Sequence, residues 1–187
     1  MADAGTEPGR RLRADAEENR RLLLTVARAA LDADGDATMK AVARAAGVGQ
    51  GTLYRHFPTR GALLVAVYKD EFADLLAASE ALAAAHPPVE ALRAWLDNLA
   101  AFGRKKRALA HVLDAATQAG LHQQQYDETL SAIDALLSRG IASGDIREDA
   151  RPEDLITLAS FLWHLETPGE RRVSRLLDLV VDAFRSR

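Results

Sequence analysis

Cysteine is absent from the sequence, which excludes disulfide bonds, thiol catalysis and cysteine-ligated zinc. Aromatic residues are also scarce, at 5% of the chain, whereas hydrophobic residues make up 48% and are mostly alanine and leucine. Because alanine and leucine are strong helix formers, the composition favours an all-helical protein. The sequence also lacks the alternation of apolar and polar residues that is typical of strands, which agrees with this prediction.

Long hydrophobic runs are absent as well. The apolar stretches are short, as at residues 62–68, so no segment is expected to span a membrane. The first residues are polar and carry arginines, and they lack the apolar core of a signal peptide. We therefore expect a cytoplasmic protein.

The usual signatures of an enzyme are also missing. The sequence has no recognisable nucleophile–base pair, glycine-rich phosphate loop or metal-ligand spacing, and its five histidines form no i, i+4 pair. We therefore expect no catalytic activity, no cofactor and no bound metal.

Acidic residues do not occur between Asp36 and Asp70, although the whole chain has a net charge of −3. This acid-free window carries five basic residues, which are Lys40, Arg44, Arg55, Arg60 and Lys69. A cationic patch on an otherwise acidic protein suits local binding of phosphate groups and limits unspecific adhesion. The window is thus the candidate nucleic-acid-binding region.

The chain before the window divides into two parts. Residues 1–14 are polar, show no apolar periodicity and are predicted to form a disordered arm. The arginines of this arm either follow the DNA backbone or only keep the arm in solution; they are Arg10, Arg11 and Arg13. From residue 15 to residue 33, apolar residues recur at three- and four-residue steps and predict a helix.

Inside the window, residues 37–60 predict a helix-turn-helix, which begins with a short helix. Thr38 has a hydroxyl that can cap the helix N-terminus. Gly47 can take the left-handed backbone that commonly ends a helix. The apolar face between them consists of Met39, Val42, Ala43 and Ala46.

The second short helix of this motif fits residues 50–56. Leu53 and Phe57 are spaced i, i+4 and are predicted to face inward. Pro58 disfavours helical geometry at the residue before it, so the helix should stop there, and Thr59 can cap a longer helix that follows. Two short helices joined by a glycine-bearing turn are the sequence form of a helix-turn-helix.

The remaining chain is predicted to be helical, with about nine helices in the whole protein. Gly103 and Gly120 are interpreted as breaks, and Pro168–Gly169 separates the last two helices. The predicted helices are 59–85, 89–102, one that follows the basic run 104–107 and ends at about 118, 122–142, 153–166 and 169–185.

Two runs of residues carry a resemblance to a known family. Residues 42–48 read VARAAGV, and residues 52–60 read TLYRHFPTR and are followed by a leucine pair at 63 and 64. With these runs, residues 20–67 closely resemble TetR/AcrR-type regulators. Two positions depart from the family pattern: Gly49 replaces a common serine or threonine cap, and Gly61 replaces a common acidic residue.

This resemblance implies a three-helix DNA-binding domain at residues 15–60 and a helical effector-binding and dimerisation domain at residues 61–187. It also implies a homodimer held by the last two helices. The expected function is that of a repressor, which a small molecule of unknown identity releases from a palindromic double-stranded DNA operator. A regulator that has no effector and acts through protein partners, or as an activator, is the alternative.

The predicted DNA contacts centre on the second helix of the motif. Gln50 is the best candidate for reading a base, because its amide can pair bidentately with adenine. Gly51 would let the helix approach the DNA closely. Chemistry and the resemblance assign phosphate contacts to Thr52, Tyr54 and His56, and Arg44 and Arg60 would flank the groove.

Candidate effector-binding residues are bulky or polar groups on otherwise aliphatic helix faces. Ligand pockets are mostly apolar with a few polar anchors, so such groups are plausible lining residues, although each also suits an ordinary core. The candidates are Trp95, Phe102, His111, Gln118 and Trp163.

Overall fold

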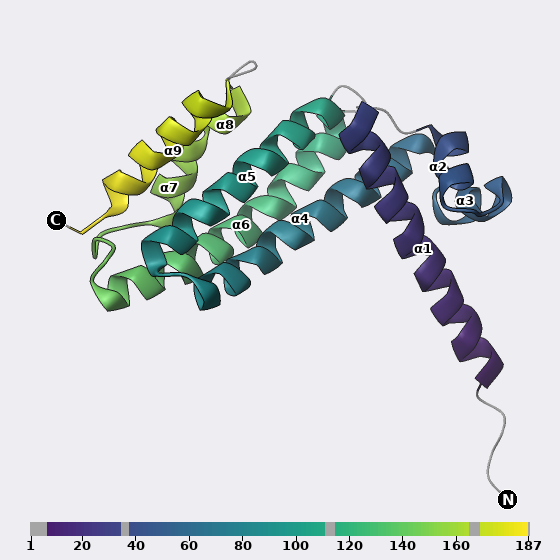
Figure 1. The fold of residues 1–187 in the computed structure, drawn as a ribbon, viewed down its shortest axis with the longest axis horizontal. Coiled ribbons are helices and arrows are strands. Elements are labelled where there is room, and N and C mark those ends of the chain that lie inside the picture. Colours follow the sequence, from purple (N-terminus) through teal and green to yellow (C-terminus); the bar gives the residue numbers. More distant parts are fainter. Residues whose placement is uncertain (1–6, 35–37, 111–114, 165–168, 187) are drawn as a thin grey trace, which may run out of the picture. The chain divides into compact units, whose positions relative to one another are not determined.

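The computed structural model describes residues 7–34, 38–110, 115–164 and 169–186. In this part of the chain the fold is all-helical, as predicted, and nine helices follow one another (Figure 1). They are α1 (Glu7–Asp34), α2 (Met39–Ala45), α3 (Gln50–His56), α4 (Arg60–Ala85), α5 (Pro88–Ala110), α6 (Ala115–Ser143), α7 (Pro152–Ala159), α8 (Phe161–His164) and α9 (Glu170–Phe184).

The chain forms two compact units, residues 1–70 and residues 71–187. α4 contributes to both, because its first turns belong to the first unit and the remainder to the second. The division falls beyond residue 60, since Leu63 and Val67 of α4 are buried in the core of the first unit.

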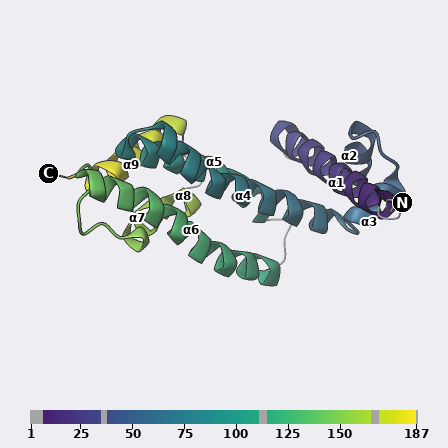
Figure 2. The same ribbon diagram turned by 90° about the horizontal axis from the view of Figure 1, so that it is seen from below.

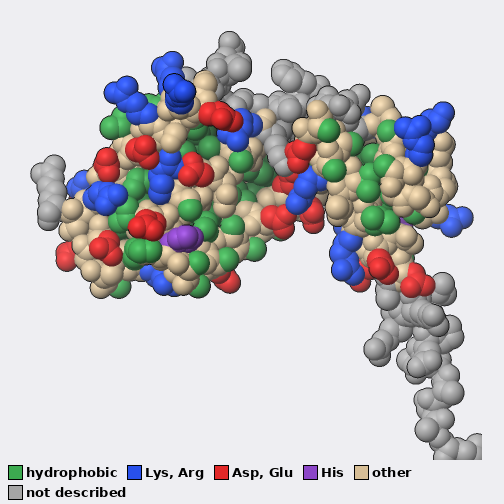
Figure 3. Space-filling view, in the orientation of Figure 1, with side chains coloured by type: hydrophobic (Ala, Val, Ile, Leu, Met, Phe, Trp, Pro, Cys, Tyr) green, Lys and Arg blue, Asp and Glu red, His purple; other side chains and the backbone are tan. Residues whose placement is uncertain are grey.

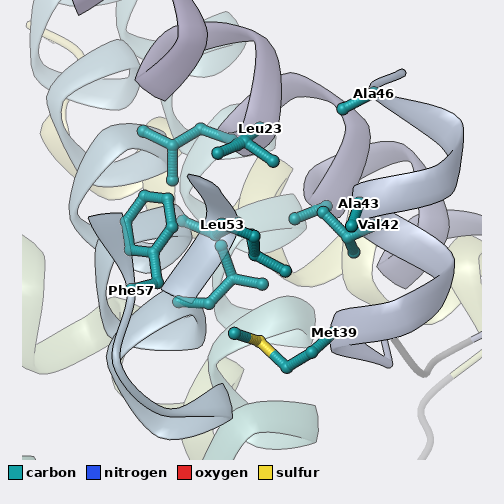
Figure 4. Close-up of a cluster of buried hydrophobic side chains, with 11 residues drawn as sticks. Leu23, Met39, Val42, Ala43, Ala46, Leu53 and Phe57 are labelled. Atoms are coloured by element: carbon teal, nitrogen blue, oxygen red, sulfur yellow. The ribbon is translucent and has the colours of Figure 1, made fainter. Parts of the chain in front are cut away.

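Apolar side chains from four helices form the core of the first unit. Figure 4 shows Leu23 of α1, Val42 of α2 and Leu53 of α3 converging on one interior. The inward orientation predicted for Leu53 and Phe57 is confirmed, since they are 0% and 2% exposed. Burying a leucine stabilises a fold by about 1.5–3 kcal/mol, so packing of these periodic positions holds the two short helices in place.

Two threonine caps set the starts of helices in this unit, as predicted. The Thr38 hydroxyl accepts a hydrogen bond of 3.3 Å from the backbone N–H of Ala41 in the first turn of α2. The Thr59 hydroxyl accepts one of 3.0 Å from the N–H of Ala62 in the first turn of α4. Each bond satisfies a backbone donor that has no partner within its helix.

In the second unit, α5 packs against α6, α8 and α9, and Figures 1 and 2 both show it running beside α6 and α9. Trp95 of α5 is fully buried, and its indole N–H donates a hydrogen bond of 3.1 Å to the carbonyl of Leu75 in α4. The rings of Phe72 and Phe102 add a tilted contact, with 5.6 Å between their centroids. Within the described parts of the chain, no helix combines the length and apolar character needed to cross a membrane.

The loop between α6 and α7 is tied to the end of α9. The N–H of Arg147 donates to the carbonyl of Phe184, and the N–H of Ser186 donates to the carbonyl of Asp145, both at 3.0 Å. Gly140 of α6 leaves room for the buried side chain of Ile146, which a Cβ at this position would strike. The close approach of loop and helix therefore depends on this glycine.

Several predicted helix boundaries were wrong. α1 begins at Glu7, so residues 7–14, predicted to be disordered, are helical; Pro8 stands in the first turn, where proline needs no hydrogen-bond partner. α5 continues through Gly103, and α6 contains Gly120. A single glycine costs a helix only about 1 kcal/mol, which tertiary packing offsets.

The predicted helix at residues 153–166 also differs from the structure. It is divided into α7 and α8 at Ser160, whose N–H bonds to the carbonyl of Thr157, three residues back, at 3.1 Å. This bond tightens the last turn of α7 and ends its regular α-helical pattern.

Candidate nucleic-acid interface

The turn between α2 and α3 has the left-handed glycine that the sequence predicted. Gly47 has a φ of +67°, and its N–H donates to the carbonyl of Arg44 at 3.2 Å. The N–H of Val48 donates to the carbonyl of Ala43 at 3.0 Å. This bond pair satisfies the last carbonyls of α2 and reverses the chain sharply. Gly49 then forms the N-cap of α3 without a side-chain hydrogen bond.

α3 has one buried and one exposed side. Leu53 points into the core, whereas the next residue, Tyr54, is 48% exposed. The exposed residues of α3 are Gln50, Gly51, Tyr54 and Arg55, and the half-buried ones are Thr52 and His56. The structure therefore brings five of the predicted DNA-contacting residues together on one accessible short helix.

The two flanking arginines lie at the neighbouring helix ends. Arg44 is exposed in the last turn of α2, and Arg60 is half-buried at the first position of α4. At the outer edge of the first unit, on the right of Figure 3, Lys and Arg side chains have no acidic side chain beside them. The described residues include no ion-pair partner for Lys40, Arg44 or Arg55.

Arg20 of α1 also lies at this helix-turn-helix, and the sequence reasoning missed it. Its guanidinium carbon lies 5.5 Å from the centroid of the Phe57 ring, at the C-terminal end of α3. The spacing of Arg20 could have indicated its position, because Arg20 precedes the buried Leu23 and Leu24 by about one helical turn. Arg20 is therefore at the edge of the face of α1 that packs on the core.

The candidate effector residues are only partly covered by the structure. Trp95 and Phe102 are buried in the second unit, and the Trp95 N–H already has its partner in the carbonyl of Leu75. His111 lies outside the described residues, as do the side chains of Gln118 and Trp163. Both residues lie on α5 and have a partner in α4, which is the backbone carbonyl of Leu75 for Trp95 and the ring of Phe72 for Phe102.

A groove of about 550 Å³ lies elsewhere in the second unit, between α5 and α9. Arg93 crosses it and reaches Asp178 and Ser174 on α9, as well as Asp97 on its own helix. Neither Trp95 nor Phe102 lines this groove. Its walls are largely charged, and within the described residues no group of histidines and carboxylates has the arrangement of a metal site.

α7 and α9 pack against each other, and each carries an exposed leucine. Leu158 of α7 is 49% exposed, and Leu179 of α9 is 56% exposed. Ile156 and Leu176 on the same two helices are half-buried. A partner that covered both leucines would remove apolar surface from water.

The first unit has a glycine turn between two short helices, an inward-facing Leu53 and an exposed α3, and a larger helical unit follows it in the chain. These features define the class of helix-turn-helix DNA-binding proteins. Comparisons with known proteins then give the family. Residues 23–67 match the model of bacterial regulatory proteins of the tetR family, and residues 87–186 match the C-terminal domain of SbtR-like transcriptional regulators.

Individual relatives agree with these matches. The chain is 31% identical over 157 residues to the transcriptional repressor KstR of Mycobacterium tuberculosis, covering 76% of this chain and 69% of the relative. It is 38% identical to a TetR transcriptional regulator of known structure from Streptomyces coelicolor, with a TM-score of 0.76 over 89% of this chain and 98% of the other. A TetR regulatory protein from Mycobacterium vanbaalenii is 30% identical, with a TM-score of 0.70 over 93% and 99%.

The chain belongs to the TetR family of transcriptional regulators. The family resemblance predicted from residues 42–48 and 52–60 is thereby confirmed, as is the all-helical fold. The fold and family are those of DNA-binding regulators.

Proposed function

We propose that the protein is a homodimeric repressor that binds a palindromic operator and leaves it when a small-molecule effector binds the second unit. The exposed side of α3 carries this proposal, because it presents Gln50 and Tyr54 to solvent while Leu53 anchors the helix from behind. The name of the relative KstR, a transcriptional repressor, supports repression over activation.

Each residue of the interface would have its own task. Gln50 would read a base, since its amide can donate to and accept from an adenine edge in the major groove. Thr52, Tyr54 and His56 would bind backbone phosphates and so position the helix. Arg44 and Arg60 would hold the phosphates on the two sides of the groove.

Dimerisation would use the last helices of the chain, α7, α8 and α9. The half-exposed Leu158 and Leu179 support this assignment, because a second copy would remove them from water. Two such helical edges pack as a bundle across a twofold axis. The two copies of α3 would then enter successive major grooves about 34 Å apart.

The effector would bind among the helices of the second unit, with apolar walls that include Trp95 and Phe102. The other predicted lining residues, His111, Gln118 and Trp163, complete this proposal. A thermal-shift screen of the whole protein against small metabolites tests it, since binding to the folded state raises the melting temperature. A screen without any stabilising compound would favour the alternative regulator that acts through protein partners.

Operator binding is tested by selecting duplex DNA from a random pool with the full-length protein. We expect an enriched sequence with twofold symmetry and two half-sites one helical turn apart. The matched variant is Tyr54→Ala, which keeps the buried Leu53 and should enrich the same sequence with lower affinity, because it removes a phosphate contact. A wild-type protein that enriches no duplex sequence would refute the proposed function.

A further inference from the structure

Arg20 differs from its neighbours on α1 in how its charge is used. Arg28, two turns further along, forms an ion pair of 3.0 Å with Asp70 of α4. Arg20 is exposed and has no carboxylate partner among the described residues, and its guanidinium lies over the ring of Phe57. The charge of Arg28 is thus neutralised within the unit, whereas the charge of Arg20 is not.

The ring beneath Arg20 is firmly held. Phe57 is 2% exposed, and its N–H donates a hydrogen bond of 2.8 Å to the carbonyl of Leu53 at the end of α3. A guanidinium near an aromatic face is attracted by the ring quadrupole and still has N–H groups to donate. The helix C-terminus also attracts a cation. Arg20 is therefore held at the end of α3, and its N–H groups have no hydrogen-bond acceptor among the described residues.

The length of α3 places this charge near the wall of a DNA groove. Seven residues at 1.5 Å each give a helix about 10 Å long, and the major groove of B-DNA is about 12 Å wide. A recognition helix contacts bases mainly with its N-terminal residues, which here include Gln50. Its C-terminal end then faces the sugar–phosphate backbone.

We propose that Arg20 is a further phosphate-binding residue of the DNA interface, held in place by Phe57. This proposal rests on the proposed function of α3. Arg20 would add one charge-assisted contact from α1 at the end of the recognition helix opposite Gln50. It would position the protein on DNA without selecting the base sequence.

The experiment measures operator affinity as a function of salt concentration for full-length variants. Arg20→Ala should lower the slope of the log–log plot by about one and reduce affinity on the order of tenfold at low salt. Arg20→Met keeps an unbranched apolar side chain against Phe57 and should show the same fall in slope. Arg20→Lys should keep the slope and recover part of the affinity.

Arg21→Ala is the matched control, because Arg21 is the adjacent exposed arginine and its side chain has no hydrogen bond, ion pair or ring contact with the described residues. Its slope should equal that of the wild type. A merely structural role for Arg20 would lower the melting temperature and leave the slope unchanged, and that result would overturn the proposal. If the wild type binds no specific duplex, the proposed function fails instead, so the two failures are distinguishable.

Discussion

Arg93 of α5 and Asp178 of α9 form an ion pair of 2.6 Å that joins the two helices within the second unit. The same guanidinium donates to the hydroxyl of Ser174 at 2.9 Å and pairs with Asp97. Burial opposes its charge, but the hydrogen bonds to Asp97 and Asp178 outweigh burial and raise the pKa of Arg93. One side chain thus fastens α9, the proposed dimer helix, to α5.

Arg93→Ala is expected to lower the free energy of unfolding by about 1–2 kcal/mol, because it removes charged hydrogen bonds and the packing of the aliphatic stem. Urea unfolding followed by circular dichroism measures this. The control is Arg185→Ala, which breaks the more exposed pair with Asp182 and should cost less than about 0.5 kcal/mol. Equal losses in the two variants would show that the Arg93 cluster is no stronger than an ordinary surface pair.

A substitution at Gly51 is expected to affect the stability of the fold and the affinity for DNA differently. A Cβ at this position meets no atom within 4 Å, and the residue lies in a regular helix. Gly51→Ala should therefore leave the fold intact or stabilise it by up to about 1 kcal/mol. We expect the same variant to lose operator affinity at least about tenfold, because a methyl group would keep α3 away from the DNA.

Gel-shift titration together with thermal unfolding measures both effects of Gly51→Ala. Gly61→Ala is the control, since the added Cβ there also has room, with its closest neighbour 3.8 Å away. Unchanged operator binding by Gly51→Ala would remove the close-approach role.

Tyr54 and Gln50 are predicted to act on DNA in different ways. Tyr54→Ala should weaken binding to all sequences while the dimer stays folded, because it removes a phosphate contact from an exposed position. Gln50→Ala should relax the sequence preference by about 1–3 kcal/mol at one base pair. Quantitative selection on random DNA, with circular dichroism to check folding, distinguishes the two. A Gln50→Ala variant with the wild-type preference would exclude base reading by this residue.

Leu179 tests the proposed dimer surface. Leu179→Glu places a charge on a side chain that is 56% exposed in the single chain, so the fold should tolerate it, whereas a buried dimer contact should not. Sedimentation equilibrium should then report a monomer. Leu22→Glu, at a leucine of the first unit that is 43% exposed, should leave the oligomeric state unchanged. A dimeric Leu179→Glu protein would place the dimer surface elsewhere.

Asp149 provides a pH-dependent prediction. Hydrogen bonds of 2.5 and 2.7 Å from Arg147 lower the pKa of this carboxyl group. Because the pKa is lower in the folded chain than in the unfolded chain, ionised Asp149 stabilises the fold above the unfolded-state pKa. This stabilisation is lost as the pH falls through the folded-state pKa.

Arg147→Gln should raise the pKa of Asp149 towards its ordinary value, which an NMR titration of the carboxyl carbon would measure. Arg151→Gln should raise this pKa less, because Arg151 lowers it only through its charge and has a smaller effect than Arg147, which also donates hydrogen bonds to Asp149. An unchanged pKa in Arg147→Gln would contradict the observed pairing.

The sequence alone predicted the helix-turn-helix almost residue by residue. Its signals are local. The Thr38 hydroxyl caps the helix that begins at the next residue by accepting from an N–H three residues ahead, and Gly47 needs no neighbour in order to adopt a left-handed backbone. The spacing of Leu53 and Phe57 likewise follows from the helical period. The same locality explains why residues 42–60 sufficed to predict the family, which the comparisons confirmed.

Contacts between residues distant in sequence were decided only by the tertiary structure. No local pattern indicates that Arg20 meets Phe57, that Arg93 reaches Asp178, or that α5 continues through Gly103. Such contacts depend on which helices pack together, and packing can offset the small cost of a glycine within a helix. Local hydrogen-bonding chemistry therefore determined the helix-turn-helix, whereas the packing of whole helices decided which side chains distant in sequence meet.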